Sequence, residues 1–568
     1  MIGERSSATS YAYDAIGKRT KLGSLNYTYD LAGRPLSVSM RDCTSCAPVP
    51  LVTSASYLPF GPESDVLFGN GTRQTKSYDS RYRITENKLT GPSAQFIARY
   101  GYTSDAAGNI TAMHDLMDAT FNRDFGYDDL SRLTSASTGT SLWGTGGFTY
   151  DAMGNLVSSS VGAWNQSFTF IGTTPRIAQA TENGSSSPVD YDAAGNELDS
   201  NYVVRPGTLV AYRSANVSRF YSCRNLMAVM SVSWVVPCGE TLAHCNPRYL
   251  MFEYDYMYDG RGVRVKAVNV SYGEIDYTYT PELRLSEIYD ASAASAQRFV
   301  WFNGYPVAQV SSTTPLFTFT DHLGTPLLQT DSAAAVAWRA EYEPYGRIYA
   351  LRNGTAPEDQ PLRLPGQDLS AHGVGAIEEN YNIFRWYRSG WGRYTQPDPL
   401  GLATEHTAIF YSDWTASTNG ENLYGYAAAR PTILTDRTGL QVAIPIPSVG
   451  PAAGAIGGAT AVAALAACWQ DAACRRWLKC TAALTKDISR CTYRGFCNAT
   501  SNDPLHNLRV ESCILRSWAN YRACRQGWPR PFPDPWPGPG FRGPGGDPGS
   551  PDEPPPTYAE PPAVVNWQ

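Results

Sequence analysis

The sequence predicts a mainly β protein with a small α-helical, cysteine-rich module near its C-terminus. Three observations support this fold class. Aromatic residues make up 12% of the 568 residues, and 36 of them are Tyr, which is enriched in strands. Gly and Pro contribute 50 and 40 residues, enough for many turns. A Tyr-Asp-x-x-Gly pattern recurs along the first half of the chain, whereas the C-terminal part lacks it and is rich in Cys.

The composition also limits the classes of function. Charged residues make up 17% of the chain, below the usual ~25%. The net charge of -6 is mild, so charge does not identify the whole chain as a nucleic-acid binder. Six His residues leave little room for a His-rich metal enzyme, and we recognise no cofactor motif. We therefore expect no cofactor.

The repeated pattern predicts a series of β-hairpins. An alternating tract such as Phe148–Tyr150 suits a strand, the following Asp starts a turn, and Gly adopts a positive φ without steric cost. Since a lone hairpin is marginal in water, the units must stack, and we expect repeats and core to form one continuous sheet. Clear copies begin at Tyr13, Tyr29, Tyr150, Tyr191 and Tyr258, and weaker ones at Tyr78, Tyr102 and Tyr127.

The same Asp-x-x-Gly-Asn pattern has a second interpretation, a calcium site like those of glycine-rich β-helix repeats. The period here, 23 to 25 residues from Tyr78 to Tyr150, is two to three times too long, and Arg often replaces Asn. Turn formation is therefore favoured, with calcium as the alternative.

Further motifs follow the repeats at the C-terminal end of the β-rich part. They are DHLGTP at 321–326, YEPYG at 342–346, LPGQ at 364–367, GRYTQPDPLGL at 392–402 and DRTGL at 436–440. Together with the Tyr-Asp units, they resemble the RHS (rearrangement hotspot) or YD-repeat family and its repeat-associated core domain. The resemblance covers roughly residues 11 to 440. It implies YD repeats over 1–290 and the core domain over 291–440.

The resemblance implies a spiral β-sheet that forms a hollow shell around the polypeptide after the core. About 430 residues are few for a closed shell, which leaves an open shell as the alternative. The resemblance also implies that the segment after the core is a variable, often toxic, cargo.

The resemblance further implies self-cleavage between Leu440 and Gln441, with Asp398, Asp436 and Arg393 as the catalytic residues. Two carboxylates held close together cannot both ionise easily, so one can activate water while the protonated one donates to the scissile carbonyl. The arginine would hold the ionised partner or the developing oxyanion.

This sequence departs from the family at Arg437, where the family has Pro. Its positive charge is expected to favour the ionised form of Asp436. The alternative for both aspartates is a purely structural role at the start of turns, because Asp-Pro and Gly-Leu are ordinary turn sequences.

Two other candidate sites are weaker. His322 lies in the DHLGTP motif but has no identifiable base or nucleophile partner, so a packing or turn role is favoured. Cys43 and Cys46 form a C-x-x-C pair without a second pair at zinc-ligand spacing. A loop disulfide or free thiols are therefore favoured over a zinc site.

The C-terminal module is expected over 441–528, followed by a Pro-rich disordered tail over 529–568. The module carries a net charge of +6 and seven of the twelve Cys residues. Helices are expected at about 461–494 and 507–526, each with two Cys residues 11 positions apart on one face. An antiparallel helical hairpin would join these cysteines as Cys480–Cys524 and Cys491–Cys513.

These observations favour an RHS-type shell protein that encapsulates or presents its own C-terminal module, in secreted-toxin delivery or intercellular competition. The expected partners are that cargo, an immunity protein and a secretion-system or cell-surface partner. The basic module would suit nucleic acid or an anionic membrane, with a solvated basic face as the bland alternative, and we recognise no enzymatic constellation in it. The expected location is secreted or cell-surface, although no signal peptide is visible and the chain opens inside a repeat, as a fragment would. The alternative function is a cell-surface adhesion or carbohydrate-contact module.

Overall fold

The computed structural model describes residues 10–440, apart from 16, 44, 60, 204–213, 223, 237–247, 270–272, 313, 353–358, 370–378 and 400–421. The chain divides into two compact units, Met1–Ala463 and Ala464–Gln568, and every described residue belongs to the first. The expected helical module with its cysteines, and the Pro-rich tail, lie outside the described residues. No helix in the described ranges is long and apolar enough to cross a membrane.

The mainly β fold is confirmed, because the described residues form two large antiparallel sheets and one small one. Consecutive strands pair antiparallel within each sheet, so both large sheets are meanders. The first sheet has 17 strands. They are β1 (Tyr11–Tyr13), β2 (Arg19–Leu22), β3 (Leu25–Tyr29), β4 (Pro35–Met40), β5 (Val49–Tyr57), β6 (Glu63–Phe68), β7 (Arg73–Tyr78), β8 (Ile84–Thr90), β9 (Phe96–Ser104), β10 (Ile110–Asp115), β11 (Arg123–Tyr127), β12 (Leu133–Thr138), β13 (Gly146–Tyr150), β14 (Leu156–Val161), β15 (Trp164–Phe170), β16 (Ile177–Glu182) and β17 (Ser185–Pro188).

The second sheet has 13 strands and continues across residue 291, the expected boundary between repeats and core. They are β18 (Asp199–Val203), β19 (Ser214–Tyr221), β20 (Met227–Val236), β21 (Arg248–Tyr258), β22 (Arg264–Asn269), β23 (Gly273–Tyr279), β24 (Leu285–Asp290), β25 (Ser295–Phe302), β26 (Tyr305–Ser311), β27 (Thr314–Thr320), β28 (Pro326–Thr330), β29 (Val336–Tyr342) and β30 (Ile348–Leu351). The small sheet contains β31 (Asp368–Leu369), β32 (Glu379–Asn382), β33 (Arg385–Arg388) and β34 (Arg393–Tyr394). Three short 3-10 turns accompany the sheets: η1 (Ala119–Phe121), η3 (Ser389–Trp391) and η5 (Ala427–Ala429).

The Tyr-Asp units form hairpin turns through one repeated set of hydrogen bonds. In the turn after β13, Asp151 Oδ1 accepts the backbone N–H of Asn155 at 2.9 Å, and Gly154 has a φ of +77°. Asp151 Oδ2 accepts the Asn155 side-chain amide at 2.8 Å. The turn interpretation of the pattern is therefore confirmed.

The same turn explains why Arg and Asn alternate at the fifth position. In the turn at Asp30, Arg34 donates its backbone N–H to Oδ1 at 2.8 Å and its Nε to Oδ2 at 2.7 Å. The turn at Asp79 repeats both bonds with Arg83, at 2.9 and 2.7 Å. Asn and Arg both donate to the second carboxylate oxygen, so either residue completes the turn.

In several units the Tyr ties its strand to the preceding one. Tyr78 OH donates to Glu63 O at 2.9 Å, and Tyr127 OH donates to Ile110 O at 2.6 Å. A β-bulge lies immediately before each of these Tyr residues. The bulge increases the local twist, and the hydroxyl bond satisfies a backbone carbonyl beside it.

The expectation of one continuous sheet is wrong, because the ladder stops between β17 and β18. The segment between them pairs with itself, through an isolated bridge between Tyr191 and Glu197. The Glu197 N–H then donates to Thr395 O, beyond the small sheet's last strand, at 2.9 Å. A backbone group that could have extended the sheet thus bonds to the residue that follows β34.

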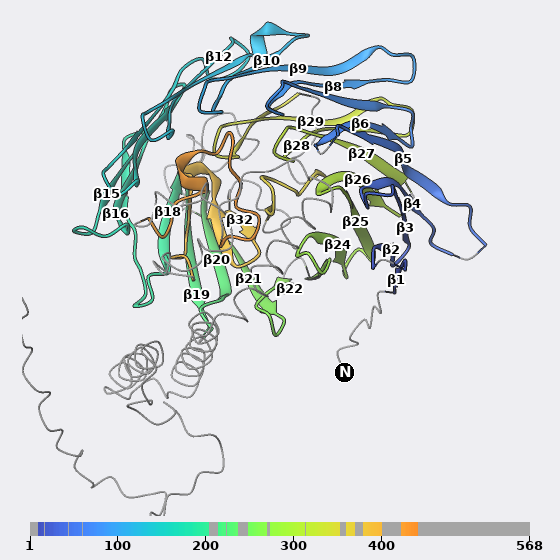
Figure 1. Cartoon of the computed structure of the whole chain (residues 1–568). Helices are drawn as coiled ribbons and strands as arrows, with labels where there is room; N and C mark the ends of the chain where they lie inside the picture. Colours follow the sequence, from blue (N-terminus) through green and yellow to red (C-terminus); the bar gives the residue numbers. More distant parts are fainter. Residues whose placement is uncertain are drawn as a thin grey trace, which may run out of the picture. The chain divides into compact units, whose positions relative to one another are not determined.

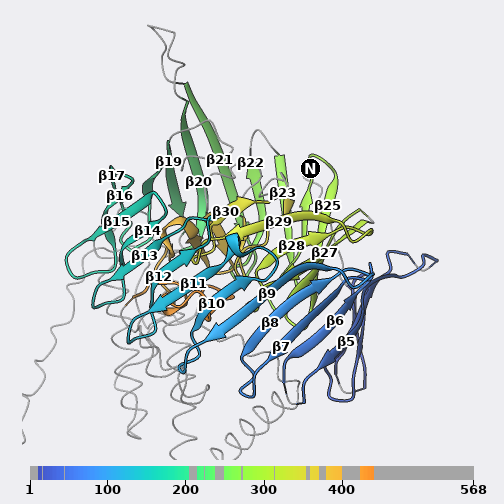
Figure 2. The same cartoon turned by 90° about the horizontal axis from the view of Figure 1, so that it is seen from above.

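The small sheet packs against both large sheets. Trp386 on β33 lies 4.8 Å from the ring of Tyr256 in the second sheet, and Trp391 lies 5.3 Å from Phe168 in the first. Both Trp side chains are buried. Figures 1 and 2 show β32 and the orange segment that ends at Leu440 on the inner side of the large-sheet strands.

Buried ion pairs join the same three sheets. Arg219 on β19 pairs with Glu379 on β32, and with Glu197 at 3.1 Å. Arg388 on β33 lies 3.4 Å from Glu197. All four side chains are almost fully buried, so removing one would leave a charge without its partner.

The two weaker candidate sites have structural roles in the described chain. Cys43 and Cys46 are joined by a disulfide, which is one of the two alternatives favoured over zinc. His322 is buried, its Nε2 lies 2.9 Å from Thr432 O, and its ring packs 5.1 Å from that of Tyr102. The expected packing role of His322 is therefore confirmed.

Candidate functional site

The two aspartates that the sequence singled out both contact one guanidinium group, that of Arg385. Arg385 Nη2 is 3.1 Å from Asp398 Oδ2 and 3.0 Å from Asp436 Oδ2. The Asp436 side chain is 2% exposed and the Asp398 side chain is 20% exposed. Two carboxylates that are far apart in the sequence therefore share one cation, and Asp398 is the more accessible to water.

The third expected residue, Arg393, makes different contacts. Its Nη2 donates to Pro175 O at 2.9 Å. Its guanidinium carbon lies 4.6 Å from the centre of the Tyr424 ring. Neither contact involves an aspartate, so the structure does not bring Arg393 together with Asp398 and Asp436 through these bonds.

The small sheet positions Arg385 and its neighbour Tyr394. Arg385 begins β33 and Tyr394 ends β34, and these strands pair through Tyr387 and Tyr394. The Arg385 guanidinium carbon lies 3.6 Å from the Tyr394 ring centre. The Tyr394 hydroxyl donates to Asp436 Oδ2 at 2.8 Å. The Tyr394 ring thus packs against the guanidinium, and its hydroxyl binds the Asp436 carboxylate.

The hairpin between β32 and β33 holds the DRTGL segment. Asn382 Nδ2 donates to Asp436 O and to the Tyr394 hydroxyl, both at 2.8 Å. Arg385 Nε donates to Gly439 O. Gly439 has a φ of +71°, and a Cβ there would lie 2.7 Å from Asn382 O. Only glycine lets the segment approach this closely.

Leu440, the residue before the expected cleavage bond, is held by Asp436 itself. Its backbone N–H donates to Asp436 Oδ1 at 3.0 Å. Gln441, on the other side of that bond, lies outside the described residues. Asp436 and Arg385 therefore both bind the backbone that leads directly into the bond.

The electrostatics of the site keep its donors protonated. Burial, followed by the charge of Asp436, raises the pKa of the Tyr394 hydroxyl well above its ordinary value, so this hydroxyl donates at neutral pH. Arg385 supplies a fixed positive charge beside the Gly439 carbonyl. The arrangement can hold a carboxylate pair next to a peptide group, as acid–base chemistry on a backbone requires.

Arg437 points away from the two aspartates. Its Nη1 lies 3.7 Å from the position that a Cβ on Gly304 would occupy, next to Arg284 Nη2 at 3.5 Å from the same point. Asp436 faces Arg385 and Tyr394 instead. The side chain of Arg437 is thus directed to a separate cavity.

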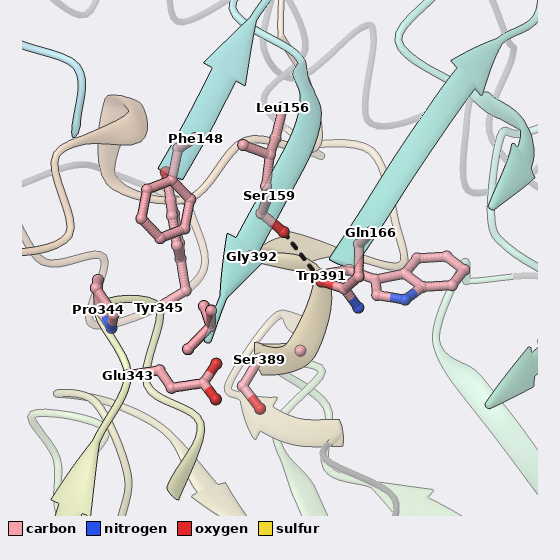
Figure 3. A pocket seen from close by; sticks show the side chains of 12 residues that line it. Phe148, Leu156, Ser159, Gln166, Glu343, Pro344, Tyr345, Ser389, Trp391 and Gly392 are labelled. Carbon is pink, nitrogen blue, oxygen red and sulfur yellow. Dashed lines mark hydrogen bonds between the residues drawn. The ribbon is translucent and has the colours of Figure 1, made fainter. Parts of the chain in front are cut away.

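A second concave region lies between β13–β15 and the small sheet, and Figure 3 shows its side chains. Its free volume is about 10 Å³, which suits one water molecule. Ser159 Oγ donates to Gln166 Oε1 at 3.1 Å across its wall. This region is a packed joint between sheets and offers no room for a substrate.

No cluster of three or more His, Cys, Asp or Glu residues suited to a metal ion occurs in the described ranges. The residues around Asp398 and Asp436 are a guanidinium, a phenol and an amide, so the donor set is that of an acid–base site. A metal ion would compete with Arg385 for the same two carboxylates.

Comparisons with known proteins identify several proteins that are similar to this chain. A family model described as "RHS protein" matches residues 317–352, within β27–β30. Double-stranded DNA deaminase toxin A of Burkholderia cenocepacia (strain H111) is 24% identical over 337 residues, which are 54% of this chain and 21% of that protein. Toxin protein Tse5 of Pseudomonas aeruginosa is 34% identical over 144 residues, which are 25% of this chain and 9% of Tse5.

Solved structures share the fold over most of the chain. The crystal structure of TcdB2-TccC3-Cdc42 superposes with a TM-score of 0.56 at 19% identity, covering 76% of this chain and 21% of that chain. The Photorhabdus luminescens Tc holotoxin pore gives a TM-score of 0.57 at 19% identity, with the same coverage. The chain thus carries an RHS match and is similar to RHS-type toxins in sequence and fold.

This chain spans about a fifth or less of the length of the two toxin relatives. What the whole relatives do is therefore a property of those proteins.

Sequence reasoning missed two side chains of the candidate site, Arg385 and Tyr394. Tyr394 stands inside the matched GRYTQPDPLGL motif, where its phenol attracted no attention. Arg385 lies between Phe384 and Trp386, and a charged residue in an aromatic run is a signal of a buried partner. Both gain their roles only when β33 and β34 pair.

Proposed function

We propose that this chain is the RHS shell part of a toxin protein, that the segment after Leu440 is its cargo, and that the chain hydrolyses its own Leu440–Gln441 bond. The observation that carries the proposal is the pair Asp398 and Asp436 around Arg385, next to Leu440. The toxin names of the relatives and the fold of the Tc toxin structures support the same role.

The proposed reaction needs only water. Asp398, the more exposed carboxylate, takes a proton from water as the water oxygen bonds to the Leu440 carbonyl carbon. The C–N bond to Gln441 then breaks, and the proton passes to the departing Gln441 amine. The products are a carboxylic acid at Leu440 and an amine at Gln441, so one water is consumed.

Asp436 and Arg385 have positioning roles in this scheme. Asp436 Oδ1 holds the Leu440 N–H, and its Oδ2 is anchored by Arg385 and Tyr394. Arg385 also contacts the neighbouring Gly439 carbonyl, which places positive charge near the developing oxyanion. The geometry thus supports Arg385, in place of Arg393, as the guanidinium of the site.

Denaturing gels and intact mass spectrometry of the purified chain test the cleavage. Wild type should yield fragments 1–440 and 441–568, whereas Asp398→Asn and Asp436→Asn should each remain full length. The matched control is Asp79→Asn, which changes the same kind of turn, where the carboxylate binds Arg83. A wild-type chain that stays intact while its β-rich part is folded would refute cleavage and leave the aspartates as turn residues.

The cargo role has a separate test. Full-length protein and a version ending at Leu440 are produced in bacteria, both in the cytoplasm and exported to the periplasm. Growth arrest that requires residues 441–568 supports a toxic cargo and predicts a neutralising immunity protein. Equal growth with both versions, in both compartments, would argue against a toxic cargo.

The adhesion alternative has less support. A carbohydrate-contact surface would need exposed Tyr and Trp side chains. Several Trp side chains of the described chain are buried instead, namely Trp143, Trp164, Trp338, Trp386 and Trp391. The exposed aromatics, such as Tyr82, Phe96 and Tyr349, are on different strands and turns. Sugar-binding surfaces need several rings together, so this distribution favours the shell role.

A further inference from the structure

A cavity of about 210 Å³ lies beside the DRTGL segment, and neither Asp398 nor Asp436 lines it. Its walls include Arg284 from the turn between β23 and β24, Trp301 from β25, and Arg437 and Thr438. A single water needs only about 10–15 Å³ on this measure, so the cavity has room for a small organic molecule.

The guanidinium groups of Arg284 and Arg437 in this cavity lack a hydrogen-bonding partner among the described residues. Arg284 Nη2 and Arg437 Nη1 both come within 3.7 Å of one point, the position a Cβ on Gly304 would occupy. The side chain of Arg284 otherwise lies 5.6 Å from the centre of the Trp301 ring. Gly304 has no side chain, so the space between the two cations stays open.

The remaining charged groups of the wall are already engaged. Glu282 accepts two hydrogen bonds from Arg19, at 2.8 and 3.2 Å. Asp368 pairs with Arg264, which lies outside the cavity wall. Arg363, also in the wall, donates to the Leu362 carbonyl at 3.0 Å. The wall carboxylates are thus hydrogen-bonded to other arginines, and Glu282 acts on Arg284 through its charge alone.

Burial and then the nearby Arg437 charge lower the pKa of the Arg284 guanidinium to about 10. The group still carries its charge at neutral pH, but burial and the Arg437 charge make the charged form less favourable. An anion between the two cations would remove the repulsion and supply the missing acceptor.

We propose that this cavity binds a small organic carboxylate, whose carboxyl group bridges Arg284 and Arg437 and whose apolar part lies against Trp301. A carboxylate matches the planar guanidinium fork. The leucine and proline side chains of the wall, Leu283, Leu323, Leu364 and Pro306, favour a hydrocarbon body over a bare inorganic ion. Glu282 at the rim is 46% exposed, so the cavity is within reach of solvent.

Isothermal titration calorimetry of the full chain tests the proposal with benzoate as the probe, at constant ionic strength. Benzoate should bind saturably, and Arg284→Gln or Arg437→Gln should weaken it at least tenfold. Arg73→Gln is the matched control, because Arg73 is an exposed arginine outside the cavity. Its affinity for benzoate should equal that of wild type.

Two further probes separate charge from shape. Benzyl alcohol, which lacks the carboxylate, should not bind, and inorganic phosphate should bind more weakly than benzoate. Absence of saturable benzoate binding, equal affinity for phosphate, or unchanged binding in both arginine variants would each overturn the proposal. These readouts do not depend on cleavage of the chain.

The melting temperature independently distinguishes a binding role of Arg437 from a purely structural one. In chloride buffer, Arg437→Gln should melt at or above the wild-type temperature, because it removes the repulsion with Arg284. Benzoate should raise the melting temperature of wild type and leave that of Arg437→Gln unchanged. A variant that melts well below wild type in chloride would overturn the proposal.

Discussion

Asp436 holds Leu440 through the same turn that closes the repeat hairpins, with its Oδ1 accepting the Leu440 N–H at 3.0 Å. In a repeat turn such as Asp151–Asn155, the fifth residue also donates its side chain to Oδ2. Leu440 has no such donor, so Oδ2 of Asp436 is left to Arg385 and Tyr394. The candidate site is therefore a repeat turn altered at one position.

This relationship predicts the effect of restoring the repeat residue at position 440. Leu440→Asn would supply an amide that competes with Arg385 and Tyr394 for Asp436 Oδ2. We expect cleavage to slow by about tenfold or more, about 1.4 kcal/mol in the barrier, in a denaturing-gel time course. Leu440→Met, which adds no donor, is the control and should cleave at close to the wild-type rate. Equal rates for both variants would contradict the prediction.

Replacement of each arginine by lysine distinguishes the roles of Arg385 and Arg393 in cleavage. Arg385→Lys replaces a planar fork that contacts two carboxylates and the Gly439 carbonyl with a point charge. We expect a loss of about 10²–10³ in the cleavage rate, the usual size for a lost oxyanion or carboxylate contact. Arg393→Lys should have a much smaller effect, because its contacts are with Pro175 and Tyr424. A larger loss for Arg393→Lys would return the role to that residue.

The packing of the small sheet on the first sheet predicts a large stability loss at Trp391. Its indole lies 5.3 Å from Phe168, and its Nε1 donates to Glu182 at 2.9 Å. Trp391→Ala should destabilise the β-rich part by about 3–5 kcal/mol in urea unfolding, because it leaves a cavity and removes one hydrogen bond to the buried Glu182 carboxylate. Phe96→Ala, at a ring that is 45% exposed, should cost much less. Similar losses for both variants would contradict the assigned packing.

The repeat turns predict the acid sensitivity of the fold. Burial alone would raise the pKa of Asp30 and Asp79, but hydrogen bonds from Arg34 and Arg83 outweigh it and lower both pKa values below 3.8. The folded state thus binds these protons more weakly than the unfolded state, so the stabilisation is present above pH 3.8 and is lost as the pH falls below it. Urea midpoints should change little from about pH 7 to 5 and fall below about pH 4. A midpoint that stays constant to about pH 2.5 would contradict the prediction.

Peptide mapping tests the expected cysteine pairing of the C-terminal module. Under oxidising conditions, the spacing predicts Cys480–Cys524 and Cys491–Cys513. Eleven residues along a helix span about 16 Å, so a bridge between Cys480 and Cys491 is excluded if the segment is helical. Detection of that bridge by mass spectrometry would refute the helical hairpin.

The sequence by itself determined the fold class and the local turns. Asp-x-x-Gly followed by Arg or Asn contains every group of the hairpin turn, because donor and acceptor are four residues apart. The RHS motifs likewise identified Asp398 and Asp436, because each stands in a recognisable local sequence. Such local interactions can be read from spacing alone.

Tertiary structure decided which charged groups meet. Arg385 contacts both aspartates because β33 and β34 pair and bring the DRTGL segment back onto them, a relationship that no spacing encodes. The break between β17 and β18 has the same origin, since Glu197 pairs with Thr395 in preference to another strand. Arg437 was expected to act on its neighbour Asp436, but the packing of Gly304 and Arg284 directs it into a cavity. Long-range contacts are selected by the packing of whole sheets, and this is why the motifs pointed to Asp398 and Asp436 but not to Arg385, which contacts both.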